Sequence, residues 1–231
     1  MTDPEAAEAA VAPPAKLAVW DLPTRLFHWT LVSLIAFSWW TGEQGPEDLH
    51  MYSGYAVLTL LIFRLLWGVF GSSTARFSRF VKGPGAVADY LRSMKNWAGI
   101  GHTPLGALSV LALLMLLFVQ VGTGLIQTDD DGLVEGPLAP LVSYDVSEAA
   151  HDLHETTFNL LLVLIGLHVA AILFYRLALG KKLVGPMITG KAELESATEP
   201  MRPGTGWVAV LCLFVALGFT RWIIAGAPPF S

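Results

Sequence analysis

The chain has 231 residues, of which 54% are hydrophobic and only 14% are charged, and its net charge is -5. Soluble domains average roughly 25% charged residues, so this composition excludes an ordinary soluble protein, and no nucleic acid partner is expected. The single cysteine, Cys212, excludes an intramolecular disulfide framework and any multi-cysteine metal or iron–sulfur site.

The chain is predicted to be an all-α integral membrane helical bundle. Residues 1–16 are expected to form a disordered tail that is rich in alanine, proline and glutamate, without the basic start and apolar core of a signal peptide. Five apolar segments follow, each close to the roughly 20 residues that cross a bilayer. Their approximate limits are Thr24–Thr41, Met51–Phe70, Leu105–Leu125, Val146–Arg176 (embedded from about Leu153) and Gly206–Ile224.

Lysine and arginine alternate between the connecting loops, and this alternation predicts the orientation of a multi-pass protein. The loop after the first segment and the loop from Gln127 to Leu153 contain neither residue, whereas the loop from Gly71 to Pro104 and the chain after the fourth segment are basic. We therefore expect the N-terminus and the basic loops on the cytoplasmic side. Within the first basic loop, Gly85–Trp97 has the apolar spacing of an amphipathic surface helix.

Four histidines fall into two pairs when each is placed by its depth in these segments. His28 and His168 are near the cytoplasmic side, and His50 and His154 are near the outer side. Residues 154 and 168 are separated by just under four helical turns, so their side chains share one face of the fourth segment, roughly 21 Å apart along its axis. Ionisable residues inside a bilayer are costly and indicate a functional site.

Two facing imidazoles suit the axial positions of a haem iron, whereas zinc commonly requires four protein ligands. No CxxCH motif is present, so the predicted haems are b-type, and iron with two histidine ligands passes single electrons. One alternative is that the histidines only form hydrogen bonds between helices. Another is a metal or proton transporter that uses them as a relay without haem.

Other residues near the histidine pairs have two interpretations each. His151 is an alternative outer ligand if the fourth helix is kinked. His102, in a Gly-His-Thr-Pro turn, is either solvated or a contact for a quinone or a haem propionate. Arg25 and Arg64 either bind haem propionates or extend their side chains to the membrane surface. Gly54 lies one turn after His50 and leaves room for a planar ring, although small residues also permit close helix packing.

Several motifs resemble those of the bacterial cytochrome b561 family, which includes the cytochrome b subunits of nickel-iron hydrogenases. These motifs are VWDLPTRLFHW (19–29), LH and GY (49–50 and 54–55), FRLLWG (63–68), GHTPLG (101–106), LHE (153–155), LHV (167–169) and MITG (187–190). The resemblance implies that residues 17–191 form a four-helix core that holds two b haems on opposite membrane sides. It implies the same ligands as the depth argument: His28, His50, His154 and His168.

The resemblance also implies a function in the inner membrane of a bacterium, where the protein would move electrons between a quinone pool and a redox partner. The partner would be a hydrogenase subunit or a c-type cytochrome, and the acidic residues 129–131 would either attract a basic cytochrome or merely solvate the loop. The alternative is a stand-alone quinone reductase with a small donor such as superoxide. Residues 192–231, a linker and a fifth transmembrane helix, depart from the family pattern.

Overall fold

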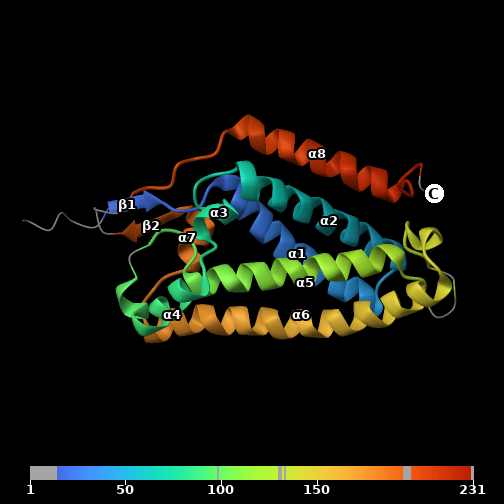
Figure 1. Cartoon of the computed structure of the whole chain (residues 1–231), viewed down its shortest axis with the longest axis horizontal. Helices are drawn as coiled ribbons and strands as arrows, with labels where there is room; N and C mark the ends of the chain where they lie inside the picture. Colours follow the sequence, from blue (N-terminus) through green and yellow to red (C-terminus); the bar gives the residue numbers. More distant parts are fainter. Residues whose placement is uncertain (1–14, 98, 130–131, 133, 195–198, 230–231) are drawn as a thin grey trace, which may run out of the picture.

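Five long helices run along one axis of the molecule in this computed structural model, which describes residues 15–97, 99–129, 132, 134–194 and 199–229 (Figure 1). They are α1 (Leu22–Gln44), α2 (Glu47–Phe70), α5 (Pro104–Ile126), α6 (Tyr144–Ala178) and α8 (Gly206–Ile224). The all-α membrane bundle predicted from the sequence is therefore confirmed.

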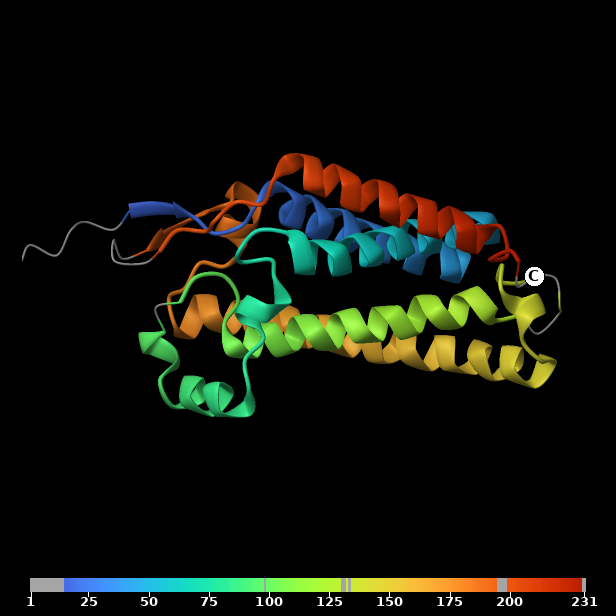
Figure 2. The ribbon, with the colours of Figure 1, turned by 45° about the horizontal axis from the view of Figure 1, so that its top comes forward.

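Two antiparallel helix hairpins form the core of the bundle. The most extensive helix contacts join α5 to α6 and α1 to α2, while α2 also contacts α5 and α8 (Figures 1 and 2). The buried core lies between these hairpins and contains Phe27, Leu61, Trp67, Leu117 and Leu161. Most of the remaining surface of α6 is apolar and exposed, as expected for a helix that faces lipid.

Four of the five expected spans are long and apolar enough to cross a membrane among the described residues: α2, α5, α6 and α8. The first, α1, is not among these four. It has 23 residues, the same length as α5, but it contains His28, two serines and three tryptophans, which lower its hydropathy. It nevertheless runs antiparallel beside α2 along the bundle (Figure 1).

The start of α1 is determined by Asp21, which caps the helix and ties it to α2. Its carboxylate accepts a hydrogen bond from the backbone nitrogen of Thr24 at 2.7 Å and from Nε1 of Trp67 at 3.0 Å. Pro23 occupies the first turn, where a missing N–H leaves no helical hydrogen bond unmade. The same carboxylate thus ends the loop and anchors two helices.

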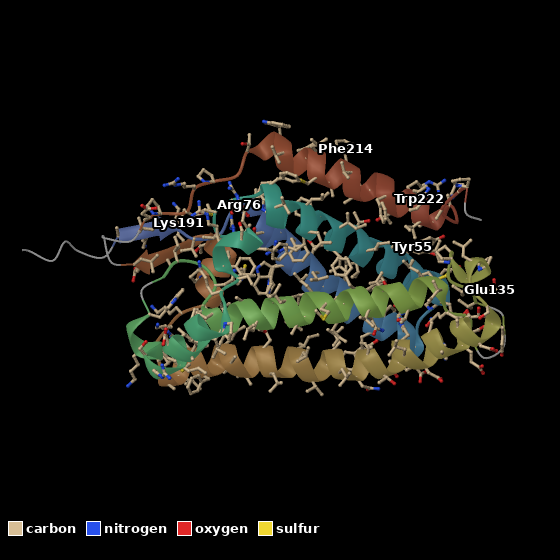
Figure 3. The ribbon with its side chains drawn as sticks, viewed as in Figure 1. Tyr55, Arg76, Glu135, Lys191, Phe214 and Trp222 are labelled. Atoms are coloured by element: carbon tan, nitrogen blue, oxygen red, sulfur yellow. The ribbon has the colours of Figure 1, made fainter. Side chains whose placement is uncertain are left out.

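The short elements gather at one end of the bundle, which we call the basic end; the opposite end is the acidic end. The short helices are α3 (Phe77–Phe80), α4 (Pro84–Arg92), η1 (Met94–Asn96) and α7 (Val184–Thr189), and the strands are β1 (Ala15–Ala18) and β2 (Lys191–Leu194). The acidic end carries the short helix η2 (Ala139–Leu141). Figure 3 labels Arg76 and Lys191 at the basic end and Glu135 at the acidic end.

The antiparallel pair of β1 and β2 is an element that the sequence pattern does not predict. It arises because the carbonyl of Gly190, a residue with a left-handed φ of 82°, accepts hydrogen bonds from the backbone nitrogens of Val19 and Trp20. Ala15 and Lys16, which the predicted tail included, belong to β1, and residues 1–14 of that tail lie outside the described residues.

The predicted surface helix over residues 85–97 is present as α4 and η1, with a break at Ser93. Tyr90 and Tyr175 are both buried, and a hydrogen bond between their hydroxyls joins α4 to the end of α6. Lys181 donates to the carbonyls of Met94 and Trp97 at 3.1 and 3.3 Å. The segment is therefore fastened to the bundle by polar contacts as well as by its apolar face.

The C-terminal helix α8 packs against α2 on the side opposite α5 and α6 (Figure 2). Cys212 and Ala216 are buried in this contact, and Thr59 Oγ1 donates to Thr220 Oγ1 at 2.9 Å. Before α8 begins, two hydrogen bonds join Arg202 to Ser73 at the end of α2. Arg202 and α8 are therefore an integral part of the bundle.

Candidate functional site

The outer histidine pair, His50 and His154, faces across the acidic end of the bundle. His50 is in the first turn of α2 and His154 is on α6, and their ring centroids are 6.1 Å apart with the ring planes at 79°. Two imidazoles that bind opposite sides of one metal ion, through metal–nitrogen bonds of about 2 Å, have centroids about 6 Å apart. The separation of this pair therefore matches two axial ligands of one iron.

Hydrogen bonds fix the orientation of both rings. His50 Nδ1 lies 2.9 Å from the carbonyl oxygen of Ser38, and His154 Nδ1 lies 2.8 Å from the carbonyl oxygen of Gln120. A carbonyl only accepts, so each Nδ1 carries the proton and each Nε2 keeps a free lone pair. This is the tautomer that a metal ligand requires, with the hydrogen-bonded carbonyl raising the basicity of the ligand.

Threonine side chains surround the His154 contact. Thr123 Oγ1 is 3.2 Å from His154 Nδ1, and it donates to carbonyls one turn earlier on α5. The hydroxyl of Thr157, one turn after His154, donates to the side-chain oxygen of Gln120. These bonds hold α5 and α6 in register beside the ring, and no pattern in the sequence marks either threonine.

A cavity of about 460 Å³ lies around the outer pair and is lined by both rings. Five of its lining residues are glycines, among them Gly42, Gly54 and Gly124. A Cβ on Gly42 would lie 3.1 Å from the ring of His50, and one on Gly124 would lie 3.0 Å from the ring of His154, whereas Gly54 borders open space. A side chain at Gly42 or Gly124 would therefore push against an imidazole; of these glycines, the sequence analysis singled out only Gly54.

His151 also lines this cavity, one turn before His154 on α6. Its Nε2 is 3.9 Å from a carboxylate oxygen of Glu155, and the ring that faces His50 belongs to His154. The geometry therefore favours His154 over His151 as the partner of His50. Of the acidic residues 129–131, only Asp129 lies within the described residues, and it borders the same cavity.

The inner pair, His28 on α1 and His168 on α6, lies toward the basic end. Both rings are half-buried and near enough to interact electrostatically. His168 Nδ1 is 3.3 Å from Oγ of Ser109 on α5, whereas Nδ1 of His28 is buried without a hydrogen-bond partner. Each pair thus combines one histidine of α6 with one of the α1–α2 hairpin, with which α6 makes few contacts.

Arg25 is one turn before His28, but the structure engages it with α7. Its Nη1 donates to the carbonyl of Ile188 at 2.6 Å, and Trp29 Nε1 donates to the carbonyl of Met187 at 3.2 Å. These bonds explain why the residues of the MITG motif lie against the start of α1. The sequence reasoning considered Arg25 only as a cofactor or interface residue and missed this contact.

Arg64 is buried near the inner end of α2, with only 3% of its surface exposed, so it does not extend to the membrane surface. Its guanidinium lies 4.6 Å from the ring centroid of Phe77, an arrangement typical of a cation–π contact. Asp21 interacts with it electrostatically, yet Nη1 has no hydrogen-bond partner. A buried cation with an unused donor fits an acidic group such as a haem propionate.

His102 is packed rather than solvated, which answers one alternative left open by the sequence. Its ring lies 4.6 Å from that of Trp20 and 4.3 Å from that of Phe80. Burial, and then the charge of Arg64, lower the pKa of His102 to about 3, so the ring is neutral at physiological pH. Its buried Nδ1 is unpaired, like that of His28.

The donor set fits haem better than a free metal ion. Within the described part of the chain, no group of three or more His, Cys, Asp or Glu residues is arranged to hold a metal. Each pair instead supplies two imidazoles, and the outer pair has the separation, the tautomers and the adjoining cavity that haem requires. A haem supplies the remaining four nitrogens itself.

Comparison with known proteins identifies one family. The family described as prokaryotic cytochrome b561 matches residues 19–190, which contain all four paired histidines. Searches of curated proteins and of solved structures found no match. The matched region contains α1, α2, α5 and α6, whereas α8 lies beyond it. The chain belongs to the prokaryotic cytochrome b561 family, whose members are membrane-embedded b-type cytochromes that transfer electrons.

Proposed function

We propose that this chain binds two b haems and moves electrons across the bilayer between a quinone pool and a redox partner. His28 and His168 would hold one haem at the basic end, and His50 and His154 would hold the other at the acidic end. A haem with two histidine ligands supplies one-electron redox chemistry without an open coordination position. The protein contributes the ligands, their tautomers and the spacing between the pairs, roughly 21 Å along α6.

The observation that carries this proposal is the geometry of the outer pair. A centroid separation of 6.1 Å, together with two Nδ1–carbonyl hydrogen bonds, leaves both Nε2 atoms available. Each Nδ1 bond links two neighbouring helices, but linking helices does not require the second ring nitrogen, Nε2, of either histidine. A relay for protons or metal ions would likewise have no need of glycines against each ring.

The basic end is proposed to face the cytoplasm of a bacterial cell, because positively charged loops are retained on that side of the inner membrane. The N-terminus would then be cytoplasmic. The quinone is proposed to react near the inner pair, where Nη1 of Arg64 and Nδ1 of His102 are buried without a hydrogen-bond partner. Arg64 is our first choice for a haem propionate contact, and Arg25, one turn before His28 on α1, is the second.

The acidic end is proposed to receive the redox partner. Glu43, Glu47, Asp129 and Glu155 line the outer cavity, so the rim around the outer pair is negative. Such a rim attracts a basic protein, as a c-type cytochrome or a hydrogenase subunit with a basic docking face would be. It repels an anion such as superoxide, which favours the partner protein over the stand-alone quinone reductase.

The number of haems tests the central claim. We expect a pyridine haemochrome assay on the purified chain to give two b haems per polypeptide and a quinol analogue to reduce both. One haem per chain would contradict the proposal that both histidine pairs bind haem. A protein without b-type absorption bands would contradict the proposal as a whole.

Labelling tests the orientation independently of haem content. In a Cys212→Ser background, Glu135→Cys and Lys191→Cys place one thiol at each end of the bundle. We expect a membrane-impermeant maleimide to label Glu135→Cys in spheroplasts and Lys191→Cys only after lysis. The reverse pattern would invert the proposed topology.

A further inference from the structure

A second cavity, separate from the one at the outer pair, lies at the basic end of the bundle and has a volume of about 320 Å³. Three segments that are distant in sequence form its walls. They are the connection from α2 to α4, the loop before α5 and the linker that leads to α8. The lining residues include Arg79, Lys82, Trp97, His102 and Arg202. The third wall lies beyond residue 190, so the family-matched core alone does not complete this cavity.

The cavity lies next to the ends of helices that are long and apolar enough to cross a membrane. Ser73 and Thr74 follow the end of α2 within four residues, Pro104 is the first residue of α5, and Arg202 precedes α8 by four residues. All three walls are thus next to the ends of membrane-crossing helices. Trp97 adds an aromatic side chain of the kind that is enriched at membrane interfaces.

The charge of the cavity is positive. Arg79, Lys82 and Arg202 line it, and the one acidic residue among the described lining residues is Glu199, whose carboxylate lies 3.7 Å from the guanidinium of Arg202. His102 forms part of the wall as a neutral ring with an unpaired buried nitrogen. Three cations against one carboxylate leave an excess of two positive charges for an anionic group.

We propose that this cavity binds the phosphate group of an anionic phospholipid. Basic pockets between transmembrane helices are suited to such headgroups, whose phosphate accepts several hydrogen bonds from Arg and Lys. The last two turns of α2 offer apolar surface for acyl chains, since Leu65, Val69 and Phe70 are exposed there. The bound lipid would join the C-terminal linker to the haem-binding core.

The test compares two double variants with the same loss of charge. Arg79→Gln/Arg202→Gln removes two cations from the cavity, and Arg92→Gln/Lys95→Gln removes two exposed cations from α4 and η1 at the same end of the bundle. Each haem-loaded protein is placed in nanodiscs of phosphatidylglycerol and phosphatidylcholine, and the lipid that remains bound after mild detergent extraction is counted by native mass spectrometry.

We expect the wild type and the Arg92→Gln/Lys95→Gln variant each to retain one molecule of phosphatidylglycerol in preference to phosphatidylcholine. The cavity variant should bind phosphatidylglycerol roughly tenfold or more weakly. Haem spectra of all three proteins should agree, which excludes misfolding as the cause. Equal losses in both variants, or equal retention of phosphatidylcholine, would overturn the proposal. Inorganic phosphate, added at millimolar concentration, should not displace the lipid; displacement would identify free phosphate as the ligand and refute the lipid assignment.

Discussion

The outer and inner histidine pairs each combine one histidine of α6 with one histidine of the α1–α2 hairpin, but they are held in different ways. At the outer pair, both Nδ1 atoms are bonded to backbone carbonyls. At the inner pair, His168 contacts the hydroxyl of Ser109, and His28 Nδ1 has no partner. The outer rings are therefore fixed by the fold itself, whereas the inner rings depend on a side chain.

The surroundings of the two pairs differ in charge as well. Carboxylates line the cavity at the outer pair, and the buried guanidinium of Arg64 lies near the inner end. Negative charge and strong hydrogen bonds from the ligand both stabilise the oxidised iron, while positive charge stabilises the reduced iron. We therefore expect the outer haem to have the lower reduction potential of the two. Mutations at either pair should change this difference in potential.

The largest expected effect comes from removing an outer ligand. His154→Ala should eliminate one of two haems, because the ring that faces His50 is lost and an alanine cannot coordinate iron. The pyridine haemochrome ratio should fall from about two to about one per chain, and the lower-potential component should disappear from a redox titration.

His151→Ala is the matched control for that substitution, because it removes a histidine one turn away on the same helix. We expect the control to keep both haems. If His151→Ala loses the outer haem and His154→Ala retains it, the assignment of the ligand is wrong.

A smaller effect is expected from filling the space beside an outer ring. The Cβ of Gly124→Val would start 3.0 Å from the ring of His154, so the imidazole must move, whereas the same change at Gly122 meets no atom within 4 Å. We expect Gly124→Val to lower the occupancy of the outer haem alone, measured by absorbance per chain. Equal occupancy in the two variants would show that the ring has room to adjust.

The sequence predicted most of this arrangement because the relevant signals are local. Hydropathy and loop charges located the helices, and the depth of each histidine within its apolar segment was enough to pair His50 with His154. The start of α1 can also be predicted, since Asp21 and Pro23 are typical of the first residues of a helix. Only its hydropathy was overestimated, because polar and aromatic residues are interspersed along its length.

The features that escaped prediction all depend on contacts between distant segments. The carbonyls of Ser38 and Gln120 leave no mark in the sequence, since every residue has one. Gly42 matters only because α2 brings His50 back against it, and Arg25 is bound by a carbonyl 163 residues further along the chain. Even the β1–β2 pair depends on the return of residues 191–194 to the start of α1.

Acid should destabilise the inner side of the molecule through His102. Its pKa is about 3 in the folded protein against 6.5 for an exposed histidine, so the unfolded chain binds the proton more tightly. The stability that the neutral ring contributes is complete above pH 6.5 and is lost as the pH falls toward 3. Between pH 7.5 and 5.5 this loss is about 1.4 kcal/mol.

His102→Phe removes this titration while keeping an aromatic ring between Trp20 and Phe80. The unfolding free energy of the variant should depend less on pH than that of the wild type, by about the same 1.4 kcal/mol between pH 7.5 and 5.5. Identical pH slopes would mean that His102 is accessible to protons in the folded state.

The smallest effect concerns the hydrogen bond that distinguishes the inner pair. In Ser109→Ala, His168 Nδ1 loses its hydroxyl partner, and the ligand becomes less basic. A net hydrogen bond of about 1 kcal/mol sets an upper limit of about 40 mV on the rise in the inner potential. Ser33→Ala is the control, since its hydroxyl bonds only the Trp29 carbonyl in the same helix. If a potentiometric titration shows that the lower-potential haem shifts instead, Ser109 acts on the outer pair and not on the inner one. The contrast between ligands held by the backbone and ligands held by a side chain would then be wrong.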